Sequence, residues 1–205
     1  MEIVAIKGQV RSDVGKKSTK SVRKEGRVPC VIYGNQDTQH FTIDPKEVKT
    51  LIYTPAFKLA EVELDGTAHK CIVKDIQFHP VSDEIVHIDF LSLSDGHKVN
   101  VEVPLAFEGV SPGMKSGGKL QQNLRRVKIK TTPEHLVDRL VLDISHLELG
   151  QAVRVRDIAE IEGIEIMSPP GTPIASVEVP RALRSATAAE AGEEGGEEEG
   201  EGAAE

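Results

Sequence analysis

Aromatic residues are scarce in this chain of 205 residues, which has five Phe, two Tyr and no Trp. Its cores must therefore be built mainly from aliphatic side chains and be rather thin. No apolar run approaches the roughly eighteen residues of a membrane-spanning helix. The first residues also lack the apolar stretch of about 7–15 residues and the small-residue cleavage site of a secretory signal. We therefore expect no helical membrane span and a cytoplasmic location.

Cysteine is rare as well, with only Cys30 and Cys71 in the chain. Neither belongs to a CxxC motif, and no His stands at a spacing suited to zinc. The sequence leaves a disulfide open, but two thiols with apolar neighbours in a chain without a signal are usually free core residues. We expect no metal and no cofactor.

Negative charge is concentrated at the C-terminus. The chain has 25 Lys and Arg against 33 Asp and Glu, a formal net charge of −8. Residues 186–205 hold eight Glu and no basic residue, so residues 1–185 carry 25 charges of each sign. The acidic segment has no large apolar groups to offset the entropy of ordering, and we expect it to be a disordered tail.

Positive charge gathers near the N-terminus. Residues 7–27 contain eight basic and two acidic residues, a balance of +6. A positive face on an otherwise neutral body is typical of a protein that binds a polyanion. The alternative is a solvated loop and helix whose lysines serve only solubility, and composition does not decide between the two.

The coarse pattern up to residue 93 is mostly β, with two short helices. Asp65-Gly66 is the strongest short hairpin signal available. Gly26 is placed to end a helix that begins at Ser18 or Thr19, and Asp44-Pro45-Lys46-Glu47 matches the start of another that runs to about residue 53. The expected strands are 3–10, 30–33, 41–43, 58–64, 67–77 and 85–93. This set fits a small barrel or curled sheet.

Turn residues near Ser94-Asp95-Gly96 indicate a boundary, after which a second β-rich region begins. Its expected strands are 98–107, 127–131, 140–144, 152–155 and 174–179. The predicted fold class is therefore mainly β. It has an N-terminal β-barrel domain with short helices at 1–93, a β-rich C-terminal domain at 94–185 and the Glu/Gly/Ala tail at 186–205.

Residues 113–119 satisfy the GxxxxGK pattern of a phosphate-binding loop. However, Leu120 stands where Ser or Thr must bind magnesium. Ser111-Pro112 precedes the loop, where a buried strand is required, and the residues after it favour a strand over a helix. We therefore predict a flexible Gly-rich connection and no nucleotide site.

His79, His87 and Asp89 invite a catalytic or metal interpretation, and the last two share one face of a strand. No GxSxG, HExxH or Cys/His pattern accompanies them. They make better sense as RNA contacts, together with Gln77, because a wide, shallow RNA minor groove displays 2′-hydroxyls and base edges. The cations of residues 7–27 would then hold phosphates. A bulge or strand break near Pro80 leaves open whether Gln77, His87 and Asp89 share one face.

Several segments resemble one known family, and they occur in its order. They are Val10-Arg11, Gly15-Lys16, Ser18–Arg23, Val28–Gly34, Asp75–Pro80 and His87–Phe90. Together they resemble the bacterial large-subunit ribosomal protein that binds 5S ribosomal RNA, in the long two-domain form also called general stress protein Ctc. The segments Val103–Leu105, Gly117-Gly118 and Leu147–Gly150 are similar to the extra domain of that form.

The resemblance implies a structural, non-enzymatic component of the large ribosomal subunit, located in the cytoplasm with the ribosome. Its implied partners are 5S rRNA and the neighbouring rRNA and proteins of that subunit, with no membrane and no small-molecule substrate. The alternative is a stress-linked assembly or regulatory factor that uses the same RNA-binding domain. No catalytic residue is implied. The RNA-binding residues that the resemblance implies are Arg11, Lys16, Lys17, Thr19, Lys20, Arg23, Tyr33, Gln77, His87 and Asp89. Lys17 is included because Ser21 stands where short members of the family carry a second adjacent basic residue.

Overall fold

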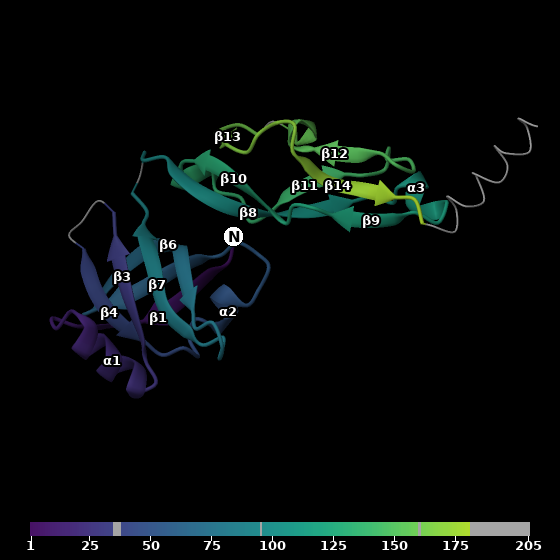
Figure 1. Ribbon diagram of the computed structural model, residues 1–205. Helices are drawn as coiled ribbons and strands as arrows, with labels where there is room; N and C mark the ends of the chain where they lie inside the picture. Colours follow the sequence, from purple (N-terminus) through teal and green to yellow (C-terminus); the bar gives the residue numbers. More distant parts are fainter. Residues whose placement is uncertain (35–37, 95, 160, 181–205) are drawn as a thin grey trace, which may run out of the picture. The chain divides into compact units, whose positions relative to one another are not determined.

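The structure is a computed structural model that describes residues 1–34, 38–94, 96–159 and 161–180. The expected acidic tail and Asp95 of the expected boundary lie outside these residues. Contacts divide the chain into two compact units, one of Met1–Leu105, Arg126–Leu140 and Glu160–Ser168 and the other of the remaining segments. Strands dominate the described residues and the helices are short (Figure 1), so the prediction of a mainly-β fold is confirmed.

The N-terminal part of the chain forms one seven-stranded sheet, in the order β1-β5-β6-β7-β3-β4-β2. Its elements are β1 (Ile3–Lys7), β2 (Gln9–Val10), α1 (Lys16–Lys24), β3 (Val28–Tyr33), β4 (Gln39–Ile43), α2 (Lys49–Ile52), β5 (Leu59–Leu64), β6 (Thr67–Phe78) and β7 (Ile85–Ser92). β1 and β2 are consecutive in sequence yet lie at opposite ends of this order. The N-terminal segment therefore crosses from one end of the sheet to the other, pairing first with β5 and then with β4, and so closes the sheet into a barrel.

Gly8 divides the single strand that the sequence predicts over residues 3–10. Its amide donates to the carbonyl of Glu63, 3.0 Å away, which continues the pairing of β1 with β5. From Gln9 onwards the chain pairs instead with β4. A Cβ atom on Gly8 would lie 2.5 Å from Leu64 and 2.7 Å from Phe41, so the crossing from one sheet edge to the other passes over the core with no room for a side chain.

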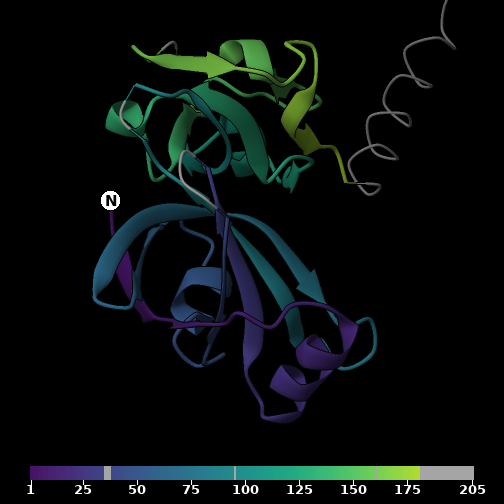
Figure 2. The same ribbon diagram turned by 90° about the vertical axis from the view of Figure 1, so that its left-hand side faces the viewer.

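The barrel core is aliphatic apart from one aromatic pair. The rings of Phe41 and Phe90, both fully buried, lie 5.7 Å apart between centroids. Cys30 and Cys71 are buried in the same core as free thiols, which confirms the prediction made for them. α2 lies inside the curve of the sheet (Figure 2), where it adds Leu51 to this core.

The second helix is much shorter than the sequence predicts, because its supposed capping group acts elsewhere. Asp44 does accept a hydrogen bond from the amide of Lys46, at 2.9 Å. The carboxylate of Glu47 does not return to the helix start but accepts from the amide of Lys7 in β1, also at 2.9 Å. The first residues therefore form turns, and regular helix is limited to Lys49–Ile52.

The predicted hairpin is confirmed. Asp65 and Gly66, with φ of 49° and 83°, join β5 to β6 in a two-residue turn. Both residues need the left-handed region, which Asp and Gly adopt at little cost, and such a turn matches the right-handed twist of the strands it joins.

The chain after residue 98 forms a four-stranded sheet, in the order β11-β8-β10-β13, and a three-stranded sheet, in the order β12-β14-β9. The elements are β8 (Val99–Glu108), α3 (Pro112–Lys115), β9 (Lys119–Gln122), β10 (Arg126–Thr131), η1 (Pro133–His135), β11 (Leu140–Asp143), β12 (Ala152–Arg154), η2 (Val155–Asp157), β13 (Ile164–Ile166) and β14 (Pro173–Glu178). All five strands expected here are present. The short strands β9 and β13 were not expected individually.

The GxxxxGK segment begins in the short helix α3 and reaches the first residue of β9 through a tight turn. The buried hydroxyl of Ser111 caps α3 by accepting from the amide of Met114, at 3.1 Å. A Cβ atom on Gly113 would lie 2.8 Å from the backbone of Glu148, so close backbone packing requires this glycine. Lys119 begins a strand and not a helix, which removes the geometry of a phosphate-binding loop.

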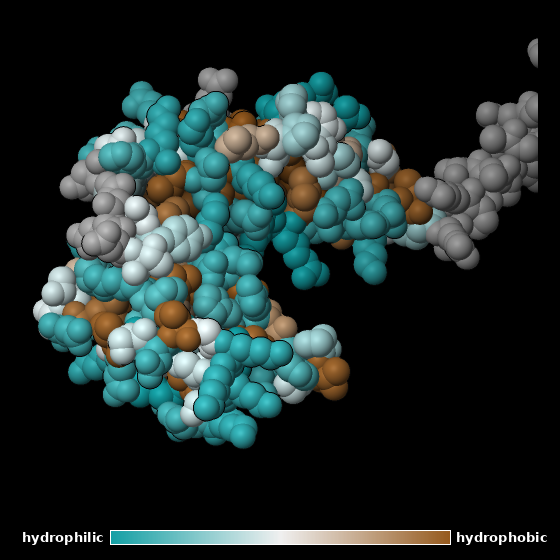
Figure 3. Space-filling model, turned by 60° about the vertical axis from the view of Figure 1, so that its left-hand side comes forward, coloured by the Kyte–Doolittle hydropathy of each residue, from teal (hydrophilic) through white to brown (hydrophobic). Residues whose placement is uncertain are grey.

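Among the helices of the described residues, none has both the length and the apolar character needed to cross a bilayer. The face drawn in Figure 3 is mainly hydrophilic, with separate small hydrophobic areas.

Candidate nucleic-acid interface

A group of polar side chains lies on the outer face of β6 and β7. In the register of these two strands, Gln77 lies opposite His87 and Asp75 lies opposite Asp89. Residues that are directly opposite in an antiparallel pair point to the same side of the sheet. Ile88, which lies between His87 and Asp89 on β7, is fully buried in the core. The polar side chains on either side of it therefore point outwards. The structure therefore brings the three polar residues predicted on these strands onto one face.

Tyr33 extends this group onto β3. It follows the buried Ile32 and is paired in register with Leu91 of β7. Partial burial raises the pKa of the Tyr33 phenol, and the negative charges of Asp89 and Asp75 raise it further. Both carboxylates therefore act on the side of the sheet that carries Tyr33. We call Tyr33, Asp75, Gln77, His87 and Asp89 the polar face.

His87 and Asp89 form the closest contact of the polar face. Nδ1 of His87 lies 2.7 Å from Oδ1 of Asp89, and both side chains are about three-quarters buried. The contact has the distance of an ion pair without the alignment of a hydrogen bond. The two groups limit each other's movement, which presents them to a ligand in one arrangement.

The predicted cations lie on α1, which begins earlier than expected. Gly15 is the N-cap residue, and the hydroxyls of Ser18 and Thr19 donate back to the carbonyls of Asp13 and Gly15, at 3.0 and 2.7 Å. These two hydroxyl residues therefore stabilise the first turn from inside it and do not cap it. The predicted end is confirmed, with Gly26 at a φ of 76° just after the last turn, the position at which glycine commonly ends a helix.

The helix exposes its lysines to solvent. Lys16, Lys20 and Arg23 follow one another at intervals of four and three residues and share one side of the helix, whereas Lys17 lies about 100° away. In the described part of the chain, none of the three lysines forms an ion pair. The helix has no buried residue, so apolar packing contributes little to holding it on the barrel.

Arg23 connects the basic helix to the polar face. Its Nε donates to the carbonyl of Val86 in β7, 3.1 Å away and 63 residues further along the chain. Val86 directly precedes His87. The contact therefore fixes the lysine-bearing side of α1 beside the polar face, and it leaves the outer guanidinium nitrogens of Arg23 for other partners.

Arg11 lies just after β2, which is separated from β7 by β3 and β4 in the order of the sheet. Its amide donates to the carbonyl of His40 at 2.9 Å, and its Nη1 donates to the carbonyl of Asp13 at 3.3 Å. Burial raises the pKa of the Cys30 thiol, while the charges of Arg11 and Asp89 act on it in opposite directions. Arg11 and Asp89 are thus both near β3, and all ten predicted residues belong to α1, the start of the segment before it, or strands β3, β6 and β7.

Sequence reasoning missed two residues of this region. Asp75 belongs to the polar face through its register opposite Asp89. Arg27 donates to the side chain of Gln9 and, at 3.2 Å, to the carbonyl of Thr42, so it ties β2 to β4 beside Arg11. The DIQFHP segment contained Asp75 but gave no sign of its orientation, because that depends on a local irregularity of β6.

His79 acts within the turn that joins β6 to β7. Its Nδ1 accepts from the amides of Val81 and Ser82, at 3.4 and 3.2 Å, and thereby closes the turn between β6 and β7. Across the ranges that the structure describes, no group of three or more His, Cys, Asp and Glu side chains is placed to hold a metal ion.

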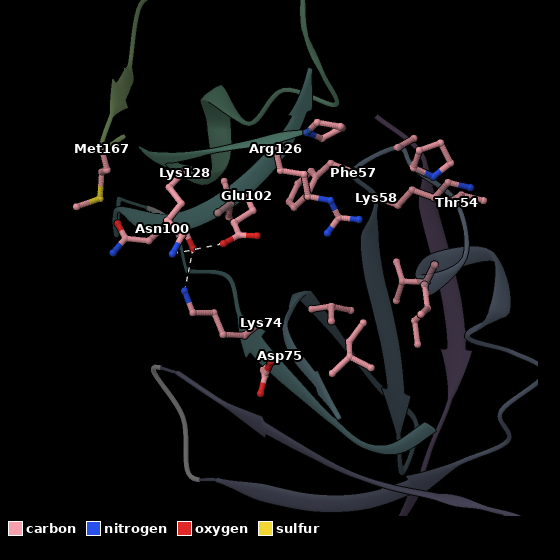
Figure 4. A pocket seen from close by; sticks show the side chains of 18 residues that line it. Thr54, Phe57, Lys58, Lys74, Asp75, Asn100, Glu102, Arg126, Lys128 and Met167 are labelled. Carbon is pink, nitrogen blue, oxygen red and sulfur yellow. Dashed lines mark hydrogen bonds and ion pairs between the residues drawn. The ribbon is translucent and has the colours of Figure 1, made fainter. Parts of the chain in front are cut away.

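None of the predicted residues lines the pocket of about 630 Å³ shown in Figure 4, although Asp75 of the polar face lies in its wall. Lys74 donates from Nζ to the carbonyl of Asn100 at 3.0 Å, and Nζ of Lys128 lies 3.6 Å from Glu102. Two of the pocket's cations are thus already engaged by oxygen atoms of the chain.

Comparison with known proteins identifies the class and then the family. Residues 6–90 match the model of the Ribosomal L25p family, and residues 98–181 match that of the ribosomal protein TL5, C-terminal domain. Both models describe ribosomal proteins.

Three relatives cover nearly the whole chain, and each is named large ribosomal subunit protein bL25. The relative from Phocaeicola vulgatus is 39% identical over 195 residues, covering 92% of this chain and 98% of that protein. The relative from Cytophaga hutchinsonii is 38% identical over 191 residues (93% and 99%), and that from Parabacteroides distasonis is 38% identical over 187 residues (91% and 93%). The chain belongs to the family of large ribosomal subunit protein bL25, in its two-domain form. Membership implies a structural role in the large subunit, with rRNA as a partner.

Proposed function

We propose that the chain binds 5S ribosomal RNA and holds it within the large ribosomal subunit, in the cytoplasm and without catalysing a reaction. The cations of α1 and Arg11 neutralise phosphates, and the polar face contacts ribose hydroxyls and base edges in an irregular minor groove. The observation that carries this proposal is the bond from Arg23 to Val86, which holds a basic helix beside a polar face.

The two parts of the proposed interface have different chemical roles. Lysine ammonium groups on a solvent-exposed helix attract any polyanion, because Coulomb attraction carries no sequence information. The side chains of Tyr33, Gln77, His87 and Asp89 instead present donors and acceptors at the fixed spacing of a sheet. A carboxylate near phosphates is unfavourable unless it accepts a hydrogen bond from the RNA, so Asp89 provides discrimination rather than attraction.

The proposed RNA-binding domain is 1–93, followed by a second domain at 94–185 and the acidic tail. Two separate family models, with a gap from residue 91 to residue 97, support a boundary in this region. The two compact units of the structure interleave along the sequence, so binding is best measured with the full chain.

Binding of the full chain to 5S rRNA and to tRNA across a salt series tests the proposal. If the five cations Arg11, Lys16, Lys17, Lys20 and Arg23 contact phosphates, the logarithm of affinity falls with the logarithm of salt with a slope of about −3.5 to −4.5. We expect a preference for 5S rRNA of about a thousandfold or more. Equal affinity for both RNAs, with a steep slope, would show a generic polyanion patch and refute the proposal.

Two variants separate attraction from discrimination. Arg11→Ala is expected to weaken binding to both RNAs and to reduce the slope by about one. Asp89→Ala is expected to weaken binding to 5S rRNA alone and to leave the slope unchanged. Lys70→Ala is the matched control for Arg11, because Lys70 is exposed on the part of β6 that pairs with β5, away from the polar face.

A further inference from the structure

Asp75 and Asp89 place two carboxylates directly opposite each other on neighbouring strands. Like charges in this position destabilise a sheet. Asp89 has the imidazole of His87 at 2.7 Å, whereas Asp75 forms no ion pair within the described residues. The exposed carboxylate of Asp75 therefore adds repulsion to the free protein without a compensating partner there.

A bulge in β6 is what turns Asp75 towards the polar face. The register with β7 shifts between Val73 and Asp75, so that Lys74 is an extra residue. Val73 and Ile76 both pack against the core although they are three residues apart. In a regular strand, Asp75 would point to the same side as Val73, into the core. The bulge places Asp75 outside, and bulges commonly redirect side chains next to functional sites.

The neighbouring cation does not neutralise Asp75. Lys74 donates to the carbonyl of Asn100, 3.0 Å away. Figure 4 shows the carboxylate of Asp75 pointing away from the Lys74 side chain. Its negative charge acts instead on Tyr33, whose pKa is raised first by burial and then by Asp89 and Asp75. Asp75 thus belongs to the polar face by both register and electrostatics.

We infer that Asp75 is a specificity-determining residue for RNA, whose carboxylate accepts a hydrogen bond from an RNA donor beside the one contacted by Asp89. The inference rests on the proposed function. The donor is either a ribose 2′-hydroxyl or the amino group of guanine, since both are displayed in the minor groove. Two adjacent carboxylates then favour an RNA groove that presents two neighbouring hydrogen-bond donors. They disfavour an RNA that presents phosphates or base acceptors at the same position, because carboxylates and these groups repel each other.

The test compares the full wild-type chain with Asp75→Ala and Asp75→Asn on 5S rRNA and on tRNA. Loss of a hydrogen bond to a charged group predicts that Asp75→Ala binds 5S rRNA about 10- to 150-fold more weakly. Its affinity for tRNA stays the same or rises, because one negative charge is removed, and the salt slope is unchanged. Asp75→Asn, which keeps the side-chain shape and an acceptor oxygen, is expected to fall between Asp75→Ala and wild type.

Glu63→Gln is the matched control. Glu63 is an exposed carboxylate on β5 of the same barrel, opposite Ala68 and outside the polar face. This substitution also removes one negative charge, and it is expected to leave the ratio of the two affinities unchanged within about twofold, since it removes no contact to RNA. Urea unfolding of all variants checks the fold, and Asp75→Asn retains the test if Asp75→Ala proves unstable.

The RNA donor is identified with 5S rRNAs that carry a single 2′-deoxy nucleotide or a single inosine in place of guanosine. At the contacted nucleotide, the modification weakens wild-type binding but not binding by Asp75→Ala. A 2′-deoxy effect of this kind assigns a ribose donor, and an inosine effect assigns the guanine amino group.

Two results overturn the inference in distinguishable ways. If wild type prefers 5S rRNA and Asp75→Ala and Asp75→Asn retain the full preference, Asp75 does not determine specificity, while the proposed function stands. If the substitutions weaken binding to 5S rRNA and to tRNA by the same factor, Asp75 again does not determine specificity and the proposed function again stands. If wild type shows no preference for 5S rRNA, the proposed function fails and the role of Asp75 fails with it.

Discussion

Replacement of Gly8 by alanine tests how the barrel is closed. The added methyl group would lie 2.5 Å from Cδ2 of Leu64 and 2.7 Å from Cδ2 of Phe41. Both neighbours are buried, Phe41 completely, so neither can turn into solvent to relieve the contact. Gly8 does not adopt a left-handed φ, and the cost therefore arises from packing and not from backbone strain.

Overpacking of a core by one methyl group costs about 1–3 kcal/mol. The affected interactions are those that hold β1 against β5 and β2 against β4, since Gly8 stands between the two pairings. Hydrogen exchange followed by mass spectrometry measures this directly. The amides of Ile3–Lys7 are expected to exchange about 5- to 150-fold faster in Gly8→Ala than in wild type. This factor corresponds to a decrease of about 1–3 kcal/mol in the free energy of local opening.

Gly171→Ala is the matched control, because a Cβ atom there meets nothing within 4 Å and its φ is not in the left-handed region. It is expected to leave exchange in β1 unchanged. Equal exchange in β1 for Gly8→Ala and wild type would show that the crossing has room for a side chain and that closure of the barrel does not require glycine at this position.

Three further predictions concern single groups. Arg23→Lys keeps the charge but loses the Nε bond to Val86, so amides of α1 are expected to exchange several-fold faster. The affinity for 5S rRNA is expected to fall about 3- to 10-fold, with the salt slope retained. Unchanged exchange of the α1 amides would refute the positioning role of Arg23. In a Tyr53→Phe background, Asp89→Asn is expected to lower the pKa of Tyr33, followed by phenolate absorbance. Because the folded-state pKa of Tyr33 is raised, its contribution to the free energy of unfolding is present below the ordinary value of about 10 and is lost as the pH rises through the folded-state value; stability that is flat over this range would contradict it. Burial raises the pKa of Cys71 to about 12 and raises that of Cys30 as well. Very little thiolate therefore exists at neutral pH, and thiol reagents should label both cysteines only after unfolding.

The sequence predicted those features that local chemistry controls. The Asp65-Gly66 turn, the end of α1 at Gly26 and the two buried thiols depend on residues that are adjacent or on apolar neighbours. The polar residues of β7 could likewise be placed on one face, because strand alternation needs no knowledge of the partner strand.

The remaining features depend on contacts between distant residues. Glu47 leaves its expected capping position because an amide of β1 competes for its carboxylate. The break at Gly8 follows from the positions of Leu64 and Phe41. Asp75 was absent from the predicted site because a bulge, defined only by pairing with β7, reverses its side. Each of these requires the register of the sheet before it can be deduced.

Closure of the barrel by its first strand has a consequence for the order of events during synthesis. Ile3 pairs with Leu59 in parallel register, so β1 leaves the ribosome well before its neighbour β5 exists. A pairing between residues this distant in sequence forms late, because loop closure must precede it. Of the barrel's strands, β1 is therefore translated first and is among the last to dock. Until then β5 and β4 each have an unpaired side, at which a nascent chain is open to association with other chains.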